Sequence, residues 1–448
     1  MNTQPIDATA FWKAVHGSFD PLEPVTDPTL RAERSRYNPM SELDARLRLP
    51  IGFMCYGVAG GVGSGKSTEL LAACGRLTDD ALVVYLDLWR HFEGRVRDPG
   101  ALDHLQPWEL VGLLGLALVR AGSDRFGHEW KGEPERLAAA LGTLSENQGP
   151  GGSIDVGKLA GGMAVVAGGM FGGAAAGAAL KALEAARDAT SWQWKLGRRD
   201  RSRTSDQDQR VRDVLDATNN IVAGLDAAYG RKLVLVVDGL DRVLAMDAFS
   251  GLFVESNLLK ELRCDIVVSM DLSLVQRYRS RLRLDQTFEL ANIPVASPEQ
   301  PSQPGPGVEF FVELVARRLK ALNRPAPAGT LFDDRVRKLA WCSGGRLRDF
   351  MRLIRELAVQ GLMHPKSPLA EDTVAKVVDS QRRDKESGLN KDELVLLQAV
   401  YDDPEHRLPG GEVALRLLEK HLLLAYPNES TWYLPHSLLT LSLLQTDR

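Results

Sequence analysis

The 448-residue sequence has few cysteines and few aromatic residues, and its positive and negative charges nearly cancel. The four cysteines are scattered and form no C-x-x-C pair, which argues against a disulfide framework or a zinc site. A net charge of −4 gives no whole-chain argument for nucleic acid or an anionic membrane as partner. The first residues show no basic stretch followed by an apolar one, so no secretory signal is expected. These features predict a cytoplasmic protein.

The composition is that of a globular chain. Charged residues make up 25% and apolar residues 44% of the sequence, which excludes an intrinsically disordered class. A chain of this length exceeds one ordinary hydrophobic core, so two to four structural units are expected.

A glycine-rich segment carries the strongest chemical signal. Residues 60–67 match G-x-x-x-x-G-K-S/T, with an apolar strand pattern before them at 51–58 and a helical pattern after them at 67–73. Glycines let successive N–H groups turn inward around an anion, and the helix N-terminus adds partial positive charge. Lys66 can reach the β- and γ-phosphates and Ser67 can bind Mg²⁺. The predicted nucleotide-binding residues are Gly60, Gly61, Val62, Gly63, Ser64, Gly65, Lys66, Ser67 and Thr68.

A second apolar run, residues 232–238, ends in an acid and reads as a strand buried on both faces. Asp238 at its end would hold Mg²⁺ through water, because a hard cation prefers oxygen ligands and keeps part of its hydration shell. Asp241 lies three residues further on and is the candidate that orients or deprotonates the attacking water.

The remaining patterns predict an α/β fold with a parallel sheet and helices on both faces. Further strands are expected at 81–88, at the end of the segment 261–269 and at 287–293, and parallel strands place a ligand at their carboxyl ends. Residues 1–50 are polar, are broken by Pro21, Pro24, Pro28 and Pro39, and are predicted to form an N-terminal strap, with Tyr37 close to the nucleotide base. A core at 51–293 is followed by a proline-rich linker at 294–307, a helical lid at 308–387 and a winged-helix unit at 388–448. In that last unit we expect helices at 391–401 and 411–424 and a strand at 430–434.

A Gly/Ala-rich insert at about 145–205 interrupts the core. It contains 22 uncharged residues that begin at Leu159 and end at Leu180, enough to span a bilayer. A single permanent span is excluded, because Lys66 and Asp238 must join one sheet. Three alternatives stay open: a flexible loop or packed hairpin, a glycine-faced helix that packs on copies of itself, or a membrane-active hairpin released on activation. An arginine-rich stretch at 195–203 follows and is read as a solvated loop or as a contact for anionic lipid or nucleic acid.

These motifs together resemble the AAA+/STAND group of P-loop ATPases over roughly residues 35–445. Most AAA+ motors place a catalytic Glu directly after the Asp of the second motif, whereas this chain has Gly239. That departure is similar to the STAND signal-transduction branch, whose members act as switches that hold ADP at rest and oligomerise on exchange to ATP. The resemblance therefore implies ATP, Mg²⁺, slow hydrolysis and a homo-oligomer. ATP rather than GTP is inferred, because no guanine signature is evident in the sequence.

The resemblance also nominates residues outside the two main motifs. Ser269 matches a sensor position that touches the γ-phosphate or the attacking water. Arg281, from the group Arg277, Arg279, Arg281 and Arg283, matches an arginine that reaches a neighbouring subunit's nucleotide, and Arg348 matches a second sensor arginine. His436 is similar to a histidine that contacts the β-phosphate of ADP, although Ser437 stands where an Asp is usual.

The predicted function is an ATP-dependent regulatory switch, with an antiviral-defence or stress-signalling role implied by the resemblance. A DNA-binding initiator or loader is one alternative, and an ATP-gated membrane-associated effector is another; the effector or partner protein is unknown. DNA contact is weakly supported because acids outnumber bases at the end of the winged unit: Arg416, Lys420 and Arg448 against Glu412, Glu419, Glu429 and Asp447.

Overall fold

The structure is a computed structural model that describes residues 7–34, 38–145, 165–167, 205–324, 333–365, 369–370, 372–427 and 431–444. The chain divides into two compact units. Unit 1 comprises Met1–Asn38, Gly61–Gly65 and Leu290–Arg448, and unit 2 comprises Pro39–Gly60 and Lys66–Glu289. The strap expected over residues 1–50 is thus divided between the two units.

Unit 2 is built on a six-stranded sheet with the order β3-β2-β4-β5-β1-β6. Its parallel strands are β1 (Cys55–Ala59), β2 (Leu82–Asp87), β4 (Leu233–Asp238), β5 (Asp265–Met270) and β6 (Gln286–Glu289). Every residue of the first four is buried, which explains their continuous apolar runs. The parallel α/β sheet predicted from the sequence is confirmed, although the strand expected at 287–293 ends at Glu289.

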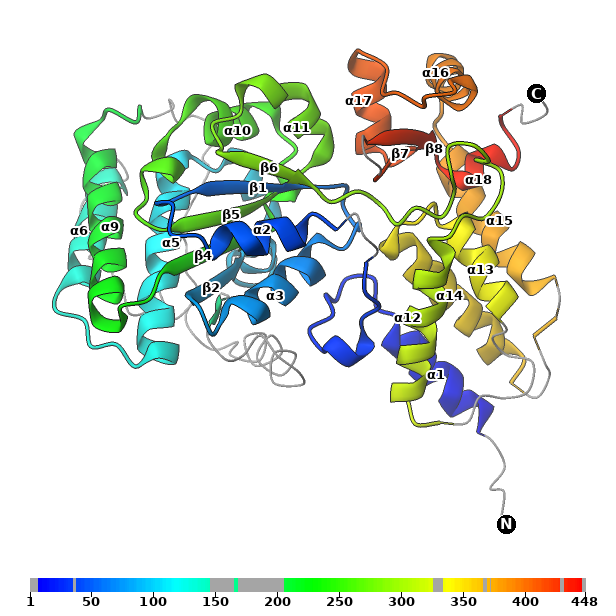
Figure 1. Cartoon of the computed structure of the whole chain (residues 1–448), viewed down its shortest axis with the longest axis horizontal. Helices are drawn as coiled ribbons and strands as arrows, with labels where there is room; N and C mark the ends of the chain where they lie inside the picture. The colour runs from blue at the N-terminus through cyan, green and yellow to red at the C-terminus, as the bar shows by residue number, and fades with distance from the viewer. Residues whose placement is uncertain are drawn as a thin grey trace, which may run out of the picture. The chain divides into compact units, whose positions relative to one another are not determined.

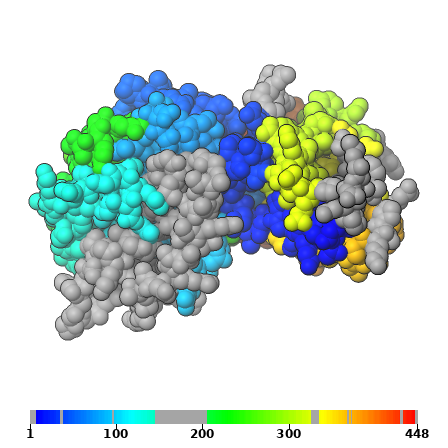
Figure 2. Space-filling model, turned by 90° about the horizontal axis from the view of Figure 1, so that it is seen from below, coloured from blue at the N-terminus to red at the C-terminus, as the bar shows by residue number. Residues whose placement is uncertain are grey.

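Helices cover both faces of this sheet (Figure 1). The longer ones are α2 (Met40–Leu47), α3 (Lys66–Leu77), α5 (Pro107–Ala121), α6 (Glu133–Ser145), α9 (Gln209–Tyr229) and α11 (Leu272–Tyr278). Pro107 and the Gln106–Glu109 capping box set the start of α5, and Gly230 ends α9 in the left-handed conformation. The cyan surface of unit 2 in Figure 2 belongs to the segment that includes α6. Short helical turns are α4 (Leu88–Arg90), η2 (His91–Val96), η3 (Pro99–His104), η4 (Gly122–Phe126), η7 (Leu240–Arg242), α10 (Met246–Ser250), η8 (Gly251–Glu255), η9 (Leu258–Glu261) and η10 (Arg279–Arg281).

The Gly/Ala-rich insert contributes the edge strand β3 (Val165–Ala167), which pairs with β2 in the antiparallel direction. These three residues lie inside the stretch from Leu159 to Leu180, so the alternative of a glycine-faced helix does not hold for them. The rest of the stretch, and the arginine-rich segment after it, lie outside the described residues. Among the described helices, none combines the length and the apolar character needed to cross a membrane.

The helical part of unit 1 surrounds an apolar core. Its helices are α1 (Ala8–Ser18), α12 (Val308–Ala321), α13 (Asp333–Cys342), α14 (Leu347–Met363) and α15 (Thr373–Glu386), with a short turn η1 (Pro28–Leu30). Phe311 and Phe350 pack with their ring centroids 4.5 Å apart, and Trp12 of α1 is buried in the same core as α14. The N-terminal segment is therefore a structural part of the helical lid in unit 1.

The winged part of unit 1 contains α16 (Lys391–Asp402), α17 (Glu412–Glu419), the antiparallel pair β7 (Leu423–Tyr426) and β8 (Trp432–Pro435), and the short α18 (Ser437–Thr440). Asn390 and Glu393 form a reciprocal capping box that fixes the start of α16. The helix expected at 411–424 was wrong at its end: α17 stops at Glu419, and the buried residues from Leu423 onward form β7.

The proline-rich linker belongs to unit 1, and the two residues before it are held in that unit by backbone hydrogen bonds. The amide of Asn292 donates to the Ala425 carbonyl (3.0 Å), and the amide of Ile293 donates to the Gly345 carbonyl (3.1 Å). Val295 is fully buried. Val295 lies in the apolar core of the helical part and Ala296 in that of the winged part, so residues that were expected to form a simple connection pack against both parts of unit 1.

Candidate nucleotide-binding site

Within unit 2, the phosphate-loop lysine is buried and paired. The Lys66 ammonium lies 2.8 Å from Oδ2 of Asp241 and donates to the Gly60 carbonyl at 2.7 Å. Only 3% of the surface of Lys66 is exposed. Ser67 and Thr68 follow in the first turn of α3 and are half-buried. The structure thus brings together Gly60, Lys66 and Asp241, three of the residues predicted from the sequence.

Within unit 1, the loop backbone from Gly61 to Gly65 is held through its carbonyl groups. The guanidinium of Arg346 donates to the Val62 carbonyl (2.6 Å), and the amide of Arg348 donates to the Gly63 carbonyl (3.2 Å). Gly63 has φ of +88°, and a Cβ there would lie 2.5 Å from Cβ of Arg348. Within the loop the Ser64 amide donates to the Gly61 carbonyl (3.0 Å), and the glycines let the backbone turn around an anion, as the motif requires.

The predicted magnesium-binding acid Asp238 accepts two hydrogen bonds in unit 2. The Tyr85 hydroxyl donates to its Oδ2 (2.6 Å), and the Gly239 amide donates to its Oδ1 (2.8 Å). Burial and the adjacent Asp238 charge raise the pKa of Tyr85 well above its usual value, so the hydroxyl stays protonated and donates. Each carboxylate oxygen has a second lone pair, so Asp238 can still accept a hydrogen bond from metal-bound water.

A further buried acid, Asp87, lies in register with Asp238 on the neighbouring strand β2. Burial, followed by the charge of Asp238, raises the pKa of Asp87 to about 7, against the opposing effect of Arg90. Sequence reasoning did not nominate this residue. The signal was the one that nominated Asp238, namely an acid at the end of an apolar strand.

Gly239 occupies the place where most AAA+ motors carry a catalytic Glu. Its φ is +86°, and a Cβ there would lie 2.5 Å from the backbone nitrogen of Trp89. A side chain at this position would therefore need both a strained backbone and a shift of the chain at Trp89. The guanidinium of Arg242 lies over the Trp89 ring, 4.2 Å from its centroid.

Ser269 lies on β5 opposite Val58 of β1 and is fully buried. Its hydroxyl has no hydrogen-bond partner among the described residues. An unsatisfied buried hydroxyl is costly unless a ligand or water completes it. Arg281, by contrast, lies exposed in η10. Of its neighbours, Arg279 pairs with Glu289, and Arg283 donates to the Val254 carbonyl.

The residues of unit 2 fit a magnesium–nucleotide ligand. The ammonium of Lys66 is already neutralised by an oxygen anion, as it would be by phosphate, and the unsatisfied Ser269 hydroxyl can accept or donate a hydrogen bond. Ser67 and Asp238 would hold the metal, directly and through water respectively. Bound Mg²⁺ would polarise the phosphate oxygens and neutralise charge that develops on them.

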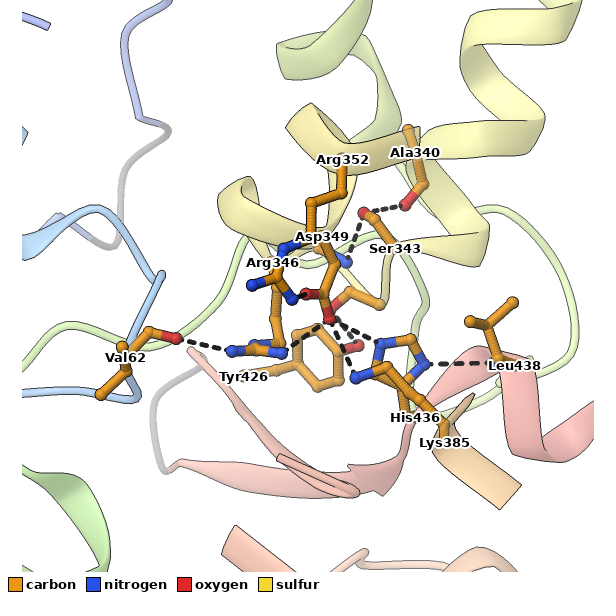
Figure 3. A network of polar contacts seen from close by, with 12 residues as sticks. Val62, Ala340, Ser343, Arg346, Asp349, Arg352, Lys385, Tyr426, His436 and Leu438 are labelled. Carbon is orange, nitrogen blue, oxygen red and sulfur yellow. Dashed lines mark hydrogen bonds and ion pairs between the residues drawn. The ribbon is translucent and has the colours of Figure 1, made fainter. Parts of the chain in front are cut away.

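Unit 1 contains a second buried charge cluster, centred on Asp349 (Figure 3). One guanidinium nitrogen of Arg346 lies 2.6 Å from Oδ2 of Asp349, while the other contacts Val62. The Lys385 ammonium lies at 3.0 Å and Nε2 of His436 at 3.3 Å from the same oxygen. Burial alone would raise the pKa of Asp349, but Arg346, His436 and Lys385 outweigh it and hold the pKa well below its usual range.

His436 is neutral in this arrangement. Its Nδ1 accepts a hydrogen bond from the Leu438 amide (3.2 Å), so Nε2 carries the proton and donates to Asp349. Burial and the nearby Lys385 charge lower the pKa of His436 to about 3, in agreement with this tautomer. Both ring nitrogens are therefore engaged within unit 1. The nucleotide contact implied by the resemblance stays a prediction.

Sequence reasoning named Arg348 and His436 but missed Arg346, Asp349 and Lys385. Arg346 and Asp349 lie in the segment that nominated Arg348, and only the fold distinguishes which arginine contacts which group. Tyr37, the candidate for contact with the base, lies outside the described residues.

Comparison with known proteins gives likenesses of structure only. No protein-family model matches the chain, and no curated protein is similar to it in sequence. Among solved structures, it is similar to Cdc6p from Pyrobaculum aerophilum, with 14% identity over 95% of each chain and a TM-score of 0.36. It is also similar to the Aeropyrum pernix Orc1 protein in complex with DNA, with 12% identity over 95% of this chain and 96% of that chain and a TM-score of 0.39. RuvB from Thermotoga maritima matches 48% of this chain and 71% of its own, with 16% identity and a TM-score of 0.24.

The chain's own features decide its fold class. The phosphate loop joins β1 to α3, the strand order is β2-β4-β5-β1-β6, and a helical and a winged part follow the sheet. This is the parallel α/β architecture with a phosphate loop, followed by a helical and a winged part, that the sequence predicts, and that prediction is confirmed for the fold class. Membership of the AAA+ group stays a proposal. Assignment to the STAND branch stays a proposal.

Proposed function

We propose that this chain is an ATP-binding, slowly hydrolysing regulatory switch that oligomerises according to its nucleotide. One observation carries the proposal: polar contacts run from the phosphate-loop carbonyl of Val62 through the buried Arg346 and Asp349 to His436 in the winged part of unit 1 (Figure 3). A change in the loop backbone when phosphate binds moves the Val62 carbonyl, which accepts a hydrogen bond from Arg346. The same guanidinium holds Asp349, so the change reaches the winged part.

Slow hydrolysis is supported by Gly239. The close approach of Trp89 leaves no room for a catalytic Glu directly after Asp238. Water must then be oriented by another group, for which Asp241 is our candidate. A switch needs a long-lived bound state more than a fast motor cycle, and this arrangement suits that requirement. A role in antiviral defence or stress signalling rests on the STAND resemblance.

The test is mass photometry of the purified chain with ADP and then with a non-hydrolysable ATP analogue. We expect growth from a small species with ADP to a defined assembly with the analogue. Lys66→Ala should stay small under both conditions, because the loop loses its phosphate-binding ammonium. A chain that hydrolyses ATP yet stays monomeric with either nucleotide would refute the oligomerising switch.

A second variant tests the network itself. Asp349→Asn removes the charge that joins Arg346 to His436, so we expect assembly to lose its dependence on the ATP analogue. Asp379→Asn is the matched control, because Asp379 pairs with Arg382 and Arg383 on the surface of α15 in the same unit. If wild type and Asp349→Asn assembled with the same nucleotide dependence, the network around Asp349 would have no part in the switch.

The DNA-binding alternative is less well supported by the winged part. The ammonium of Lys420 lies 2.8 Å and the guanidinium of Arg416 3.3 Å from the buried carboxylate of Glu393. These two bases already neutralise an internal acid, which reduces the positive charge available to phosphates. Salt-sensitive binding of the full chain to duplex DNA would favour the initiator function instead.

A further inference from the structure

The buried ion pair between Lys66 and Asp241 joins two residues that were predicted to act on the nucleotide separately. In unit 2 the Lys66 ammonium lies 2.8 Å from Oδ2 of Asp241, and both residues are buried. Yet the phosphate loop needs this ammonium for the β- and γ-phosphates. Asp241 therefore occupies the electrostatic position that a phosphate oxygen would take.

The backbone around Asp241 fixes the carboxylate in place. Asp241 lies in the turn η7, closed by hydrogen bonds from the Arg242 amide to the Gly239 carbonyl and from the Val243 amide to the Leu240 carbonyl. Leu240 and Val243 are fully buried on either side of it. The carboxylate is thus presented to Lys66 by an anchored turn rather than by a loose loop.

Another acid near Lys66 has a different task. Asp271 caps α11 by accepting hydrogen bonds from the amides of Ser273 (2.8 Å) and Leu274 (3.3 Å). Burial raises the pKa of Asp271, and the Ser273 hydrogen bond and then the Lys66 charge oppose that rise. Asp271 is committed to the start of a helix, whereas Asp241 directs its carboxylate to the ammonium itself.

We propose that Asp241 is an internal counter-anion of the phosphate-loop lysine, which a nucleotide phosphate displaces when it binds. This proposal rests on the proposed ATP-binding function and deepens it. One anion replaces another at Lys66, so the buried ammonium is never left uncompensated. The displaced carboxylate becomes available to accept a hydrogen bond from water. Phosphate binding and the release of the water-orienting acid are then one event.

Competition at Lys66 gives a result opposite to that of an ordinary binding residue. Asp241→Asn removes the competing charge, so it should bind ATP and ADP about tenfold more tightly than wild type in magnesium-free buffer. AMP lacks the phosphates that Lys66 reaches, so its affinity should not change. Asp241→Glu keeps the charge and should show no comparable gain. Isothermal titration calorimetry of the full chain measures these affinities for wild type, Asp241→Asn and Asp241→Glu.

The control is Asp80→Asn, which removes the same charge from a surface pair with Arg48 and should leave ATP affinity unchanged. Equal or weaker ATP binding by a folded Asp241→Asn would overturn the proposal. A wild-type chain that binds neither ATP nor ADP would instead refute the proposed function, so the two failures are distinguishable.

A measurement on the wild type does not depend on whether a variant folds. The carboxyl ¹³C resonance of Asp241, in a chain labelled at its aspartate carboxyl carbons, should move when ATP is added and stay in place with AMP. An Asp241 resonance that ignores saturating ATP would overturn the proposal. Thermal unfolding of each variant without nucleotide confirms that affinities are compared between folded chains.

Discussion

The two units each bury a charged side chain, and they neutralise it in different ways. In unit 2 the Lys66 ammonium faces the Asp241 carboxylate across 2.8 Å. In unit 1 the Asp349 carboxylate is contacted by Arg346, Lys385 and His436, which come from three different elements. The first arrangement lets one incoming anion replace the resident one. In the second arrangement no incoming ion can replace Asp349 in this way, because its three partners would have to move together.

Lys66 therefore lies in a ligand-binding position, whereas Asp349 lies in a structural contact between two parts of unit 1. A buried ion pair is a weak source of net stability, but removal of one partner from it is costly. At Lys66 a nucleotide phosphate can supply the missing partner. At Asp349 the protein itself supplies every partner, so the network holds the helical and winged parts of unit 1 together. Substitutions in the two places should therefore differ in their dependence on nucleotide.

The largest effect is expected from Asp349→Ala. It leaves Arg346 and Lys385 buried without their shared carboxylate, so the free energy of unfolding of unit 1 should fall by about 3–5 kcal/mol. Urea unfolding measures this loss, and saturating ATP should not restore it. Asp379→Ala on the exposed face of α15 should behave as wild type. A loss that ATP fully restored would make Asp349 part of the binding position.

Gly239→Glu tests the corresponding constraint in unit 2. The positive φ and the contact at Trp89 predict a loss of about 3 kcal/mol in unfolding free energy and no gain in ATP hydrolysis. Calorimetry and a phosphate-release assay measure the two outcomes.

Gly230→Ala is the matched control for backbone strain without crowding. Gly230 also has positive φ, +58°, but a Cβ there meets nothing within 4 Å. Gly230→Ala should lower the free energy of unfolding by about 1 kcal/mol. Gly239→Ala should lower it further, and the difference measures the effect of the close approach of Trp89. Equal costs at the two positions, or faster hydrolysis by Gly239→Glu, would contradict our account of the missing Glu.

A smaller, pH-dependent effect is expected at His436. Its pKa is about 3 in the folded chain against 6.5 for an ordinary histidine, so the unfolded chain binds the proton first as pH falls. The contribution of His436 to the free energy of unfolding is therefore fully present above pH 6.5 and declines by about 1.4 kcal/mol per pH unit from there toward pH 4. His436→Gln removes this decline, and urea unfolding at several pH values measures it. His104→Gln, at an exposed position, should leave the decline intact.

Much of the fold was predictable because its signals are local. Continuous apolar runs marked four buried strands, and the phosphate-loop motif fixed the order of strand, loop and helix. The strand β3 was missed because three residues in a glycine-rich stretch become a strand only by pairing with β2. The end of α17 was missed because β7 continues its apolar pattern, and only pairing with β8 distinguishes strand from helix there.

The candidate site divides in the same way. Lys66 and Asp238 stand in motifs that a single sequence reveals. Tyr85 and Asp87 need the register between β2 and β4 before their relation to Asp238 is visible. Arg346 and Asp349 needed the fold for a different reason. Several arginines follow Gly345, and the sequence gives no measure of which one reaches the Val62 carbonyl.

The smallest effect is expected from Tyr85→Phe, which tests how the predicted magnesium-binding acid Asp238 is held in unit 2. Its hydroxyl donates to the buried Asp238 carboxylate at 2.6 Å, so its removal should cost about 1–2 kcal/mol in unfolding free energy. Tyr56→Phe is the matched control on β1, because the Tyr56 hydroxyl is buried without a hydrogen-bond partner among the described residues. That variant should be neutral or slightly stabilising. If both variants lost the same stability, tyrosine packing and not the hydrogen bond to Asp238 would explain the loss.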